Sequence, residues 1–224
     1  YGWGRGGMRP VYPCTGQPQG LLRFKNRSEG LASTAGKFAS AFALGSALLR
    51  PTDAALADRL RERAVAAYRL GRAHPGVCQT APAGAPYFYE EANWVDDLEL
   101  AAAQLHELTG EAAYLREALE YARQEPVTPW MGQDTARHYE WFPWHNNGHH
   151  QLWRTGGDAG RRMGAEFYRR GLEAVAARSD NAFRVGIPFI WCSNNLMVSY
   201  ATQARLYRRM TGDMAFLAHE QAAL

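Results

Sequence analysis

The sequence has little cysteine, no block of positive charge and no long apolar run. Its three cysteines, Cys14, Cys78 and Cys192, are far apart and match no zinc-binding spacing. We expect reduced, partly buried thiols, with one disulfide as the alternative. The net charge is only +3, and the arginines alternate with acids and apolar residues. This distribution argues against a nucleic-acid-binding surface.

Strand signals and membrane-spanning signals are also scarce. No apolar run approaches the length that a membrane-spanning helix needs, so we expect no membrane insertion. Only residues 185–190 could form a short extended segment. The chain begins at Tyr1 without methionine or signal peptide and stops at Leu224 inside a helical pattern. We therefore expect a fragment of a longer protein.

What remains is a helical pattern. Residues 1–30 are rich in glycine and proline and predict an extended N-terminal loop segment, whereas residues 31–224 predict one all-α domain. Ser33 or Thr34 can cap the first helix, and Thr52 or Asp53 can begin the second. Apolar periodicity, caps and stop signals predict helices at 33–49, 53–71, 95–110, 111–123, 146–153, 158–178 and 193–210, and from 213 to the end.

One helix–elbow–helix pattern occurs twice. The segment Leu108-Thr109-Gly110-Glu111-Ala112-Ala113-Tyr114-Leu115 matches residues 210–217, Met-Thr-Gly-Asp-Met-Ala-Phe-Leu. Each glycine can take the left-handed conformation that ends a helix, and the following acid favours the next N-terminus. The repetition predicts an array of helical hairpins, such as a toroid, a solenoid or a large bundle.

Aromatic and acidic residues gather at 86–97, just before a predicted helix. Tyr89, Glu91, Trp94 and Asp97 belong to this stretch. Sugar rings stack on aromatic faces and their hydroxyls bond to carboxylates, so the composition suits a carbohydrate cleft. The alternative is a plain helix entry, with acids near a helix N-terminus and aromatics packed beneath it.

Two further aromatic–polar segments also precede predicted helices. Residues 138–150 contain Trp144 together with His145 and His149, which are four apart and would share a helix face. No third ligand is apparent, so we expect hydrogen-bonding histidines at the rim of a polar cleft rather than a metal site. Residues 189–195 carry Trp191 and Asn195. We hypothesise that the segments near Trp94, Trp144 and Trp191 line one cleft, although each could simply pack locally.

The order of these motifs resembles the catalytic module of family-nine glycoside hydrolases, the inverting cellulases and related β-glucanases. The segments that carry the resemblance are Ala32–Ala39, Asn93–Leu100 with the Thr109-Gly110-Glu111 elbow, Phe142–Gly148, and Trp191–Tyr207 followed by Thr211-Gly212-Asp213. Asn146 and Asn147 stand where the family usually has aspartates, and Asn195 stands at an arginine position. The resemblance implies an (α/α)6 barrel, incomplete in this chain, and a secreted or periplasmic enzyme acting on β-linked glucan.

The resemblance also implies inversion by an aspartate base and a glutamate acid, about 6.5–9.5 Å apart. Neither position has a counterpart here, and residues 1–30 contain no aspartate. The catalytic residues are therefore expected outside this chain, and the isolated fragment is expected to be inactive. The candidate substrate-binding residues are Tyr89, Glu91, Trp94, Asp97, Trp144, His145, Trp191 and Asn195. No cofactor is expected, although the resemblance would allow a bound calcium.

Other functions stay open at this point. Another α/α toroid enzyme, such as a sugar epimerase or an unsaturated-uronyl hydrolase, would use Asp96, Asp97 or His149 catalytically. A non-catalytic carbohydrate-binding or scaffold domain, or a helical-repeat interaction module, would also fit the elbows.

Overall fold

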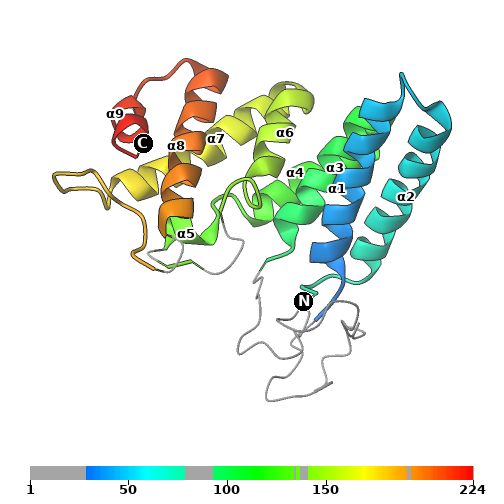
Figure 1. Cartoon of the computed structure of the whole chain (residues 1–224), viewed down its shortest axis with the longest axis horizontal. Coiled ribbons are helices and arrows are strands. Elements are labelled where there is room, and N and C mark those ends of the chain that lie inside the picture. The colour runs from blue at the N-terminus through cyan, green and yellow to red at the C-terminus, as the bar shows by residue number, and fades with distance from the viewer. Residues whose placement is uncertain (1–28, 79–92, 134, 137–140, 191–192, 224) are drawn as a thin grey trace.

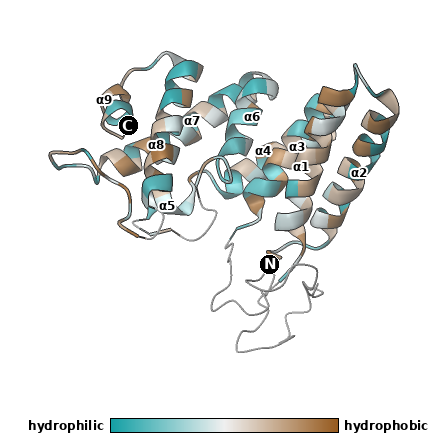
Figure 2. Ribbon diagram, in the orientation of Figure 1, coloured by the Kyte–Doolittle hydropathy of each residue, from teal (hydrophilic) through white to brown (hydrophobic). Residues whose placement is uncertain are grey.

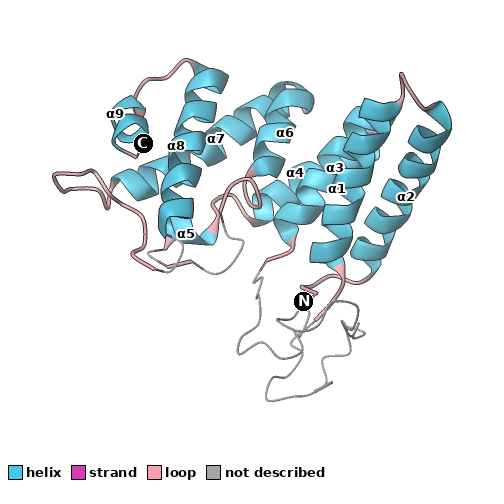
Figure 3. Ribbon diagram, viewed as in Figure 1, coloured by secondary structure: helices cyan, strands magenta, loops and turns pink. Residues whose placement is uncertain are grey.

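The computed structural model describes residues 29–78, 93–133, 135–136, 141–190 and 193–223. In these ranges the chain consists of helices joined by turns and irregular segments, without a β-strand (Figures 1 and 3). The segment at 185–190 follows an irregular path and forms no strand. The helices are α1 (Ala32–Leu49), α2 (Ala54–Ala73), α3 (Val95–Thr109), α4 (Ala112–Gln124), α5 (Pro129–Gly132), α6 (Asn147–Thr155), α7 (Gly157–Ala176), α8 (Ser193–Thr211) and α9 (Leu217–Ala222).

The longer helices pack as successive hairpins. Pairs that are adjacent in the sequence contact one another: α1 with α2, α3 with α4, α6 with α7, and α8 with α9. The first helices of neighbouring pairs also meet, because α3 contacts both α1 and α6. Figure 1 shows the first helices of these pairs beginning on the lower side of the molecule. The starts of α3, α6 and α8 therefore lie toward one end of the array.

Helix α1 approaches its neighbours through small residues. Its buried face consists of Ala32, Ser33, Ala35, Gly36, Ala39, Ser40, Ala43 and Ser46. A Cβ atom added at Gly36 would come within 2.8 Å of the Asp97 backbone and side chain, so α1 and α3 are in close contact there. In Figure 2, α1 is pale to brown over most of its length, whereas α6 is largely teal. Phe38 lies on the outer side of α1, where its side chain is 54% exposed.

One of the two predicted helix N-caps is present in the structure and the other is not. Asp53 caps α2 as predicted, since its Oδ1 accepts a hydrogen bond from the Leu56 amide at 2.8 Å. The predicted cap of α1 is wrong. That helix already begins at Ala32, and the Ser33 hydroxyl accepts a hydrogen bond from the Cys78 amide at 3.0 Å instead. Ser33 therefore joins the start of α1 to the segment that follows α2.

The repeated elbow is confirmed at both places. Gly110 (φ 74°) and Gly212 (φ 77°) are left-handed, and in each elbow the threonine hydroxyl donates to the carbonyl four residues earlier. The last helix, however, begins at Leu217 rather than at Asp213. The Asp213 carboxylate accepts hydrogen bonds from the Ala215 amide and the Tyr207 hydroxyl, and these hold a turn before the helix.

None of the helices in the described ranges is long and apolar enough to cross a membrane. This agrees with the absence of a long apolar run in the sequence.

Candidate functional site

The first turns of α3 bury three acids. Asp96, Asp97 and Glu99 are all at most 6% exposed, although they lie at the start of a helix. The other buried residues of α3 are alanines and leucines between 98 and 105, so the first three turns of this helix pack against its neighbours. Burying a carboxylate is costly unless it is paired and hydrogen-bonded. Each acid therefore needs a partner from another element.

Glu99 pairs with His149 of α6. The His149 Nδ1 and Glu99 Oε1 atoms are 2.7 Å apart, and both side chains are almost fully buried. The other ring nitrogen lies 3.1 Å from the backbone carbonyl of Glu125. Burial raises the pKa of Glu99, and His149 partly offsets that rise. Burial lowers the pKa of His149, but Glu99 outweighs it and the net direction is upward. The pair therefore holds a proton that couples α3 to α6.

A second cluster surrounds His145, in the loop before α6. Its Nδ1 lies 3.4 Å from Glu125 Oε1, 3.8 Å from Asp96 Oδ2 and 3.1 Å from the Thr128 hydroxyl. Glu125 follows α4, and its other carboxylate oxygen accepts a hydrogen bond from Asn93. The imidazole of His145 thus contacts residues from α3, the end of α4 and the segment before α5.

Two buried acids beside His145 favour its charged form. Burial lowers the pKa of His145, but the charge of Asp96 and the contact with Glu125 outweigh burial and raise it to about 9. Burial raises the pKa of Glu125, and His145 partly offsets that rise. At neutral pH the imidazolium of His145 therefore neutralises part of the carboxylate charge in this cluster.

Asp97 faces α1. Its Oδ2 lies 2.6 Å from the Lys37 ammonium, and the Asp97 side chain is buried. This ion pair joins the starts of two neighbouring hairpins. It also occupies one carboxylate oxygen of Asp97.

The loop before α6 is fixed to α7 and α8. The Phe142 amide donates to the Ser199 hydroxyl at 2.8 Å, and the Asn146 side-chain amide donates to Gln203 Oε1 at 2.7 Å. Asn146 is left-handed (φ 63°), and its carbonyl accepts a hydrogen bond from the Tyr168 hydroxyl at 2.9 Å. The segment from 142 to 146, which includes Trp144, is therefore held on both sides of the loop.

The structure brings together two of the three predicted tryptophan segments. Trp94 is half-buried and meets Tyr121 edge-on, with ring centroids 6.3 Å apart. Trp144 is 47% exposed. Asp96, two residues after Trp94, contacts His145, the residue after Trp144, so the two segments lie side by side. Asn195 is exposed in the first turn of α8. Tyr89, Glu91 and Trp191 lie outside the described residues.

The predicted rim position of the histidines is wrong. His145 and His149 are 4% and 2% exposed, because they meet acids of α3 rather than solvent. Asp97 is also buried and paired with Lys37, which leaves little of its carboxylate for a sugar hydroxyl. The exposed candidates among the described residues are Trp144 and Asn195.

Sequence reasoning missed the partners that make the cluster. Glu99, Glu125 and Thr128 were not candidates, although each contacts a histidine. One signal was present. Glu99 follows two aspartates and precedes the apolar run 100–103, and an apolar helix segment of this kind packs against neighbouring helices. Acids on such a helix need buried partners, and the histidines four residues apart provide them.

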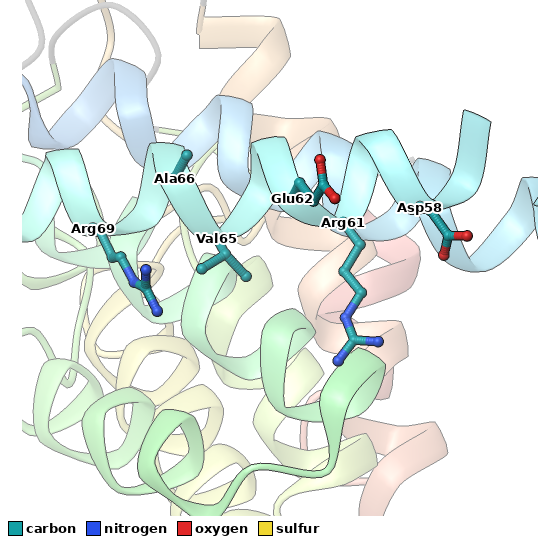
Figure 4. A pocket seen from close by; sticks show the side chains of 6 residues that line it. All are labelled: Asp58, Arg61, Glu62, Val65, Ala66 and Arg69. Atoms are coloured by element: carbon teal, nitrogen blue, oxygen red, sulfur yellow. The ribbon is translucent and has the colours of Figure 1, made fainter. Parts of the chain in front are cut away.

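An open surface groove lies elsewhere, along α2 (Figure 4). Among the described residues, those that line it belong to that helix: Asp58, Arg61, Glu62, Val65, Ala66 and Arg69. A ligand pocket normally encloses most of its ligand between several elements. One exposed helix face cannot do this, so the groove is no rival to the region around Trp94 and Trp144.

The sequence model of Glycosyl hydrolase family 9 matches residues 3–223. The chain belongs to glycosyl hydrolase family 9. Endoglucanase 15 of Arabidopsis thaliana is 34% identical over 108 residues, which are 48% of this chain and 21% of that protein. Endoglucanase 13 of the same plant is 33% identical over 127 residues, 57% of this chain and 25% of that protein.

Solved structures give the fold. A thermostable endoglucanase from Alicyclobacillus acidocaldarius superposes with a TM-score of 0.65 at 24% identity, over 86% of this chain and 36% of that one. An endoglucanase from the termite Nasutitermes takasagoensis superposes with a TM-score of 0.59 at 16% identity, over 86% and 42%. The hairpins of this family 9 chain thus belong to an (α/α)6 barrel fold. The chain spans about a fifth to a quarter of the plant relatives' length.

The buried cluster does not fit the calcium that the family resemblance allowed. Asp96, Glu125 and His145 place one potential ligand atom each within 4.8 Å of one another. Calcium takes six to eight oxygen ligands, whereas one of these three atoms is an imidazole nitrogen. One carboxylate oxygen of Glu125 also accepts a hydrogen bond from the Asn93 side chain. Among the described residues, the positive charge beside these acids comes from His145.

Proposed function

We propose that this family 9 chain is part of a glycoside hydrolase that cleaves β-linked glucan, such as cellulose, by inversion. The observation that carries the proposal is its membership of glycosyl hydrolase family 9 over residues 3–223. In the inverting reaction one carboxylate activates water and a carboxylic acid protonates the leaving oxygen. We propose that these two groups come from residues outside the 224 of this chain.

The acids inside the chain support that assignment. Asp96, Asp97 and Glu99 are buried, and each contacts a cationic side chain of another element: His145, Lys37 and His149, respectively. A hydrolytic carboxylate must instead reach the glycosidic oxygen or a water molecule in an open cleft. The same burial disfavours an epimerase or an unsaturated-uronyl hydrolase that would use Asp96, Asp97 or His149.

We assign Trp94 and Trp144 to sugar stacking. The exposed Trp144 and the half-buried Trp94 belong to adjoining segments, which supports one shared surface at the start of α3 and α6. Asn195 at the start of α8 is a hydroxyl-binding candidate on the same end of the array, and Tyr89, Glu91 and Trp191 remain proposals from the resemblance. An enzyme that degrades an external polysaccharide would be secreted or periplasmic.

Binding of cellohexaose to the intact protein tests this proposal. Trp144→Ala and Trp94→Ala should each weaken binding by about tenfold, the effect of losing one stacking contact. Trp153→Ala is the matched control, because Trp153 lies in α6 and stacks on His150 away from the Asp96–His145 contact. Unchanged binding in both variants would refute the stacking surface. Retention of anomeric configuration in the products would refute inversion.

A further inference from the structure

His145 lies between the two proposed sugar-stacking segments. It is the residue directly after Trp144, and it contacts Asp96, two residues after Trp94. We propose that His145 is a positioning residue whose buried imidazole holds the Trp144 segment against the Trp94 segment through its contacts with Asp96, Glu125 and Thr128. This inference rests on the proposed function, because it concerns how the stacking surface is held in place.

The geometry gives His145 contacts that no other described residue combines. Its Nδ1 is within 3.8 Å of Asp96 in the first turn of α3, Glu125 after α4 and Thr128 before α5. These three residues belong to different elements. The loop that carries His145 is itself bonded to α8 through Phe142 and Asn146. One ring therefore connects the start of α3, the end of α4 and the segment before α5 with the loop that presents Trp144.

The acids around the ring require a positive partner. Asp96 Oδ1 and Glu125 Oε1 are buried and have no hydrogen-bond partner among the described atoms. The charged groups facing His145 in the described chain are Asp96, Asp97 and Glu125, and Asp97 is already paired with Lys37. A neutral ring would leave two neighbouring carboxylates without compensation in a buried site, which is strongly unfavourable. Loss of the imidazolium charge should therefore loosen the contact between the two segments.

His149 has a different role. One turn further along, it pairs with Glu99 in the middle of the α3–α6 contact, and its other nitrogen lies near a backbone carbonyl. That pair joins the two helices but is further from Trp144 in the chain. The charge on His145, rather than that on His149, is thus the one next to the proposed binding surface.

Cellohexaose binding as a function of pH tests the role of His145. The His145→Asn variant keeps a polar group near the Nδ1 position but cannot carry a charge. Wild-type affinity should fall by about tenfold between about pH 7 and about pH 10, whereas His145→Asn should bind weakly at every pH in that range. His150→Asn is the matched control, since His150 lies in α6 and stacks on Trp153. It should keep the wild-type pH profile.

The outcomes separate this inference from the proposed function. If Trp144→Ala weakens binding while His145→Asn keeps the wild-type affinity and pH profile, the positioning role is refuted and the stacking surface stands. If Trp94→Ala and Trp144→Ala both bind as the wild type does, the stacking surface is refuted.

Nitrogen NMR gives a second test, and its first measurement needs only the wild-type protein. Both ring nitrogens of His145 should be protonated at neutral pH, and the Glu125→Gln variant should shift the titration to lower pH. A neutral His145 ring at pH 7 would overturn the inference. A metal ion bound to the His145 ring nitrogen would also overturn it, because that nitrogen would then carry the metal instead of a proton.

Discussion

Raising the pH should destabilise this protein over a range set by His145. The ring is protonated in the folded protein up to a pKa of about 9, whereas an exposed histidine has a pKa of about 6.5. The folded state therefore binds a proton that the unfolded state releases between these values. This stabilisation is fully present below about pH 6.5 and is lost as the pH rises to about 9.

The size of the effect follows from the pKa change. One pKa unit corresponds to about 1.4 kcal/mol, so a rise from 6.5 to about 9 corresponds to about 3 kcal/mol of unfolding free energy. Burial raises the pKa values of Tyr200 and Tyr68, but both tyrosines are present in the wild type and in the variant, so their effect cancels in the comparison. Glu99 and Glu125 also have raised pKa values, and both remain in the variant used for comparison.

Urea unfolding of the wild type and of His145→Asn, measured from about pH 6 to about pH 10, provides the assay. The stability difference between the two proteins should be largest at pH 6 and should shrink by about 3 kcal/mol by pH 10. His150→Asn serves as the control. Burial lowers the pKa of His150, so its contribution to stability changes below about pH 6.5 and not between about pH 6.5 and about pH 9. A difference between wild type and His145→Asn that does not depend on pH would refute the reasoning.

Two further substitutions probe the contacts that hold the helices together. Glu99→Ala should lower the free energy of unfolding, measured in urea, by about 3–5 kcal/mol, because it leaves His149 buried without its partner. The control Glu166→Ala removes an exposed partner of Arg169 and should lower the free energy of unfolding by less than about 1 kcal/mol. An equal loss in both variants would contradict this. Gly36→Ala should lower the thermal midpoint, since its Cβ would come within 2.8 Å of Asp97 on α3. The control is Gly45→Ala in the same helix, whose added Cβ would meet only the end of the Leu60 side chain, so the thermal midpoint should change little. If both variants have the same thermal midpoint, α1 and α3 are not packed as described.

Local signals in the sequence accounted for most helix positions. Proline, glycine and capping residues end or begin helices through bonds within a few residues, as Asp53 and Gly110 do. They failed where a distant residue competed for the same group. Ser33 was a plausible cap, but its hydroxyl is used by Cys78, and Asp213 accepts a bond from Tyr207 before the last helix can start.

Less of the candidate site than of the fold could be predicted from the sequence. The tryptophan segments were visible because aromatic and polar residues cluster before helices, and two of them do adjoin. The burial of His145, His149 and Asp97 was not visible, because the same residue types occur at an exposed rim. Their burial depends on pairs with Glu125, Glu99 and Lys37, and the two members of each pair are 20 to 60 residues apart in the sequence.

The sequence by itself determined the all-α class, the repeated elbows and the resemblance to family 9, because periodicity, caps and motif order are properties of the chain. Only the tertiary structure decided the role of the polar residues at the helix starts. Whether a histidine faces solvent or two buried carboxylates depends on which helices pack against it. That packing brings Asp96, Glu125 and His145 together from three segments and makes a predicted rim residue the buried cation between them.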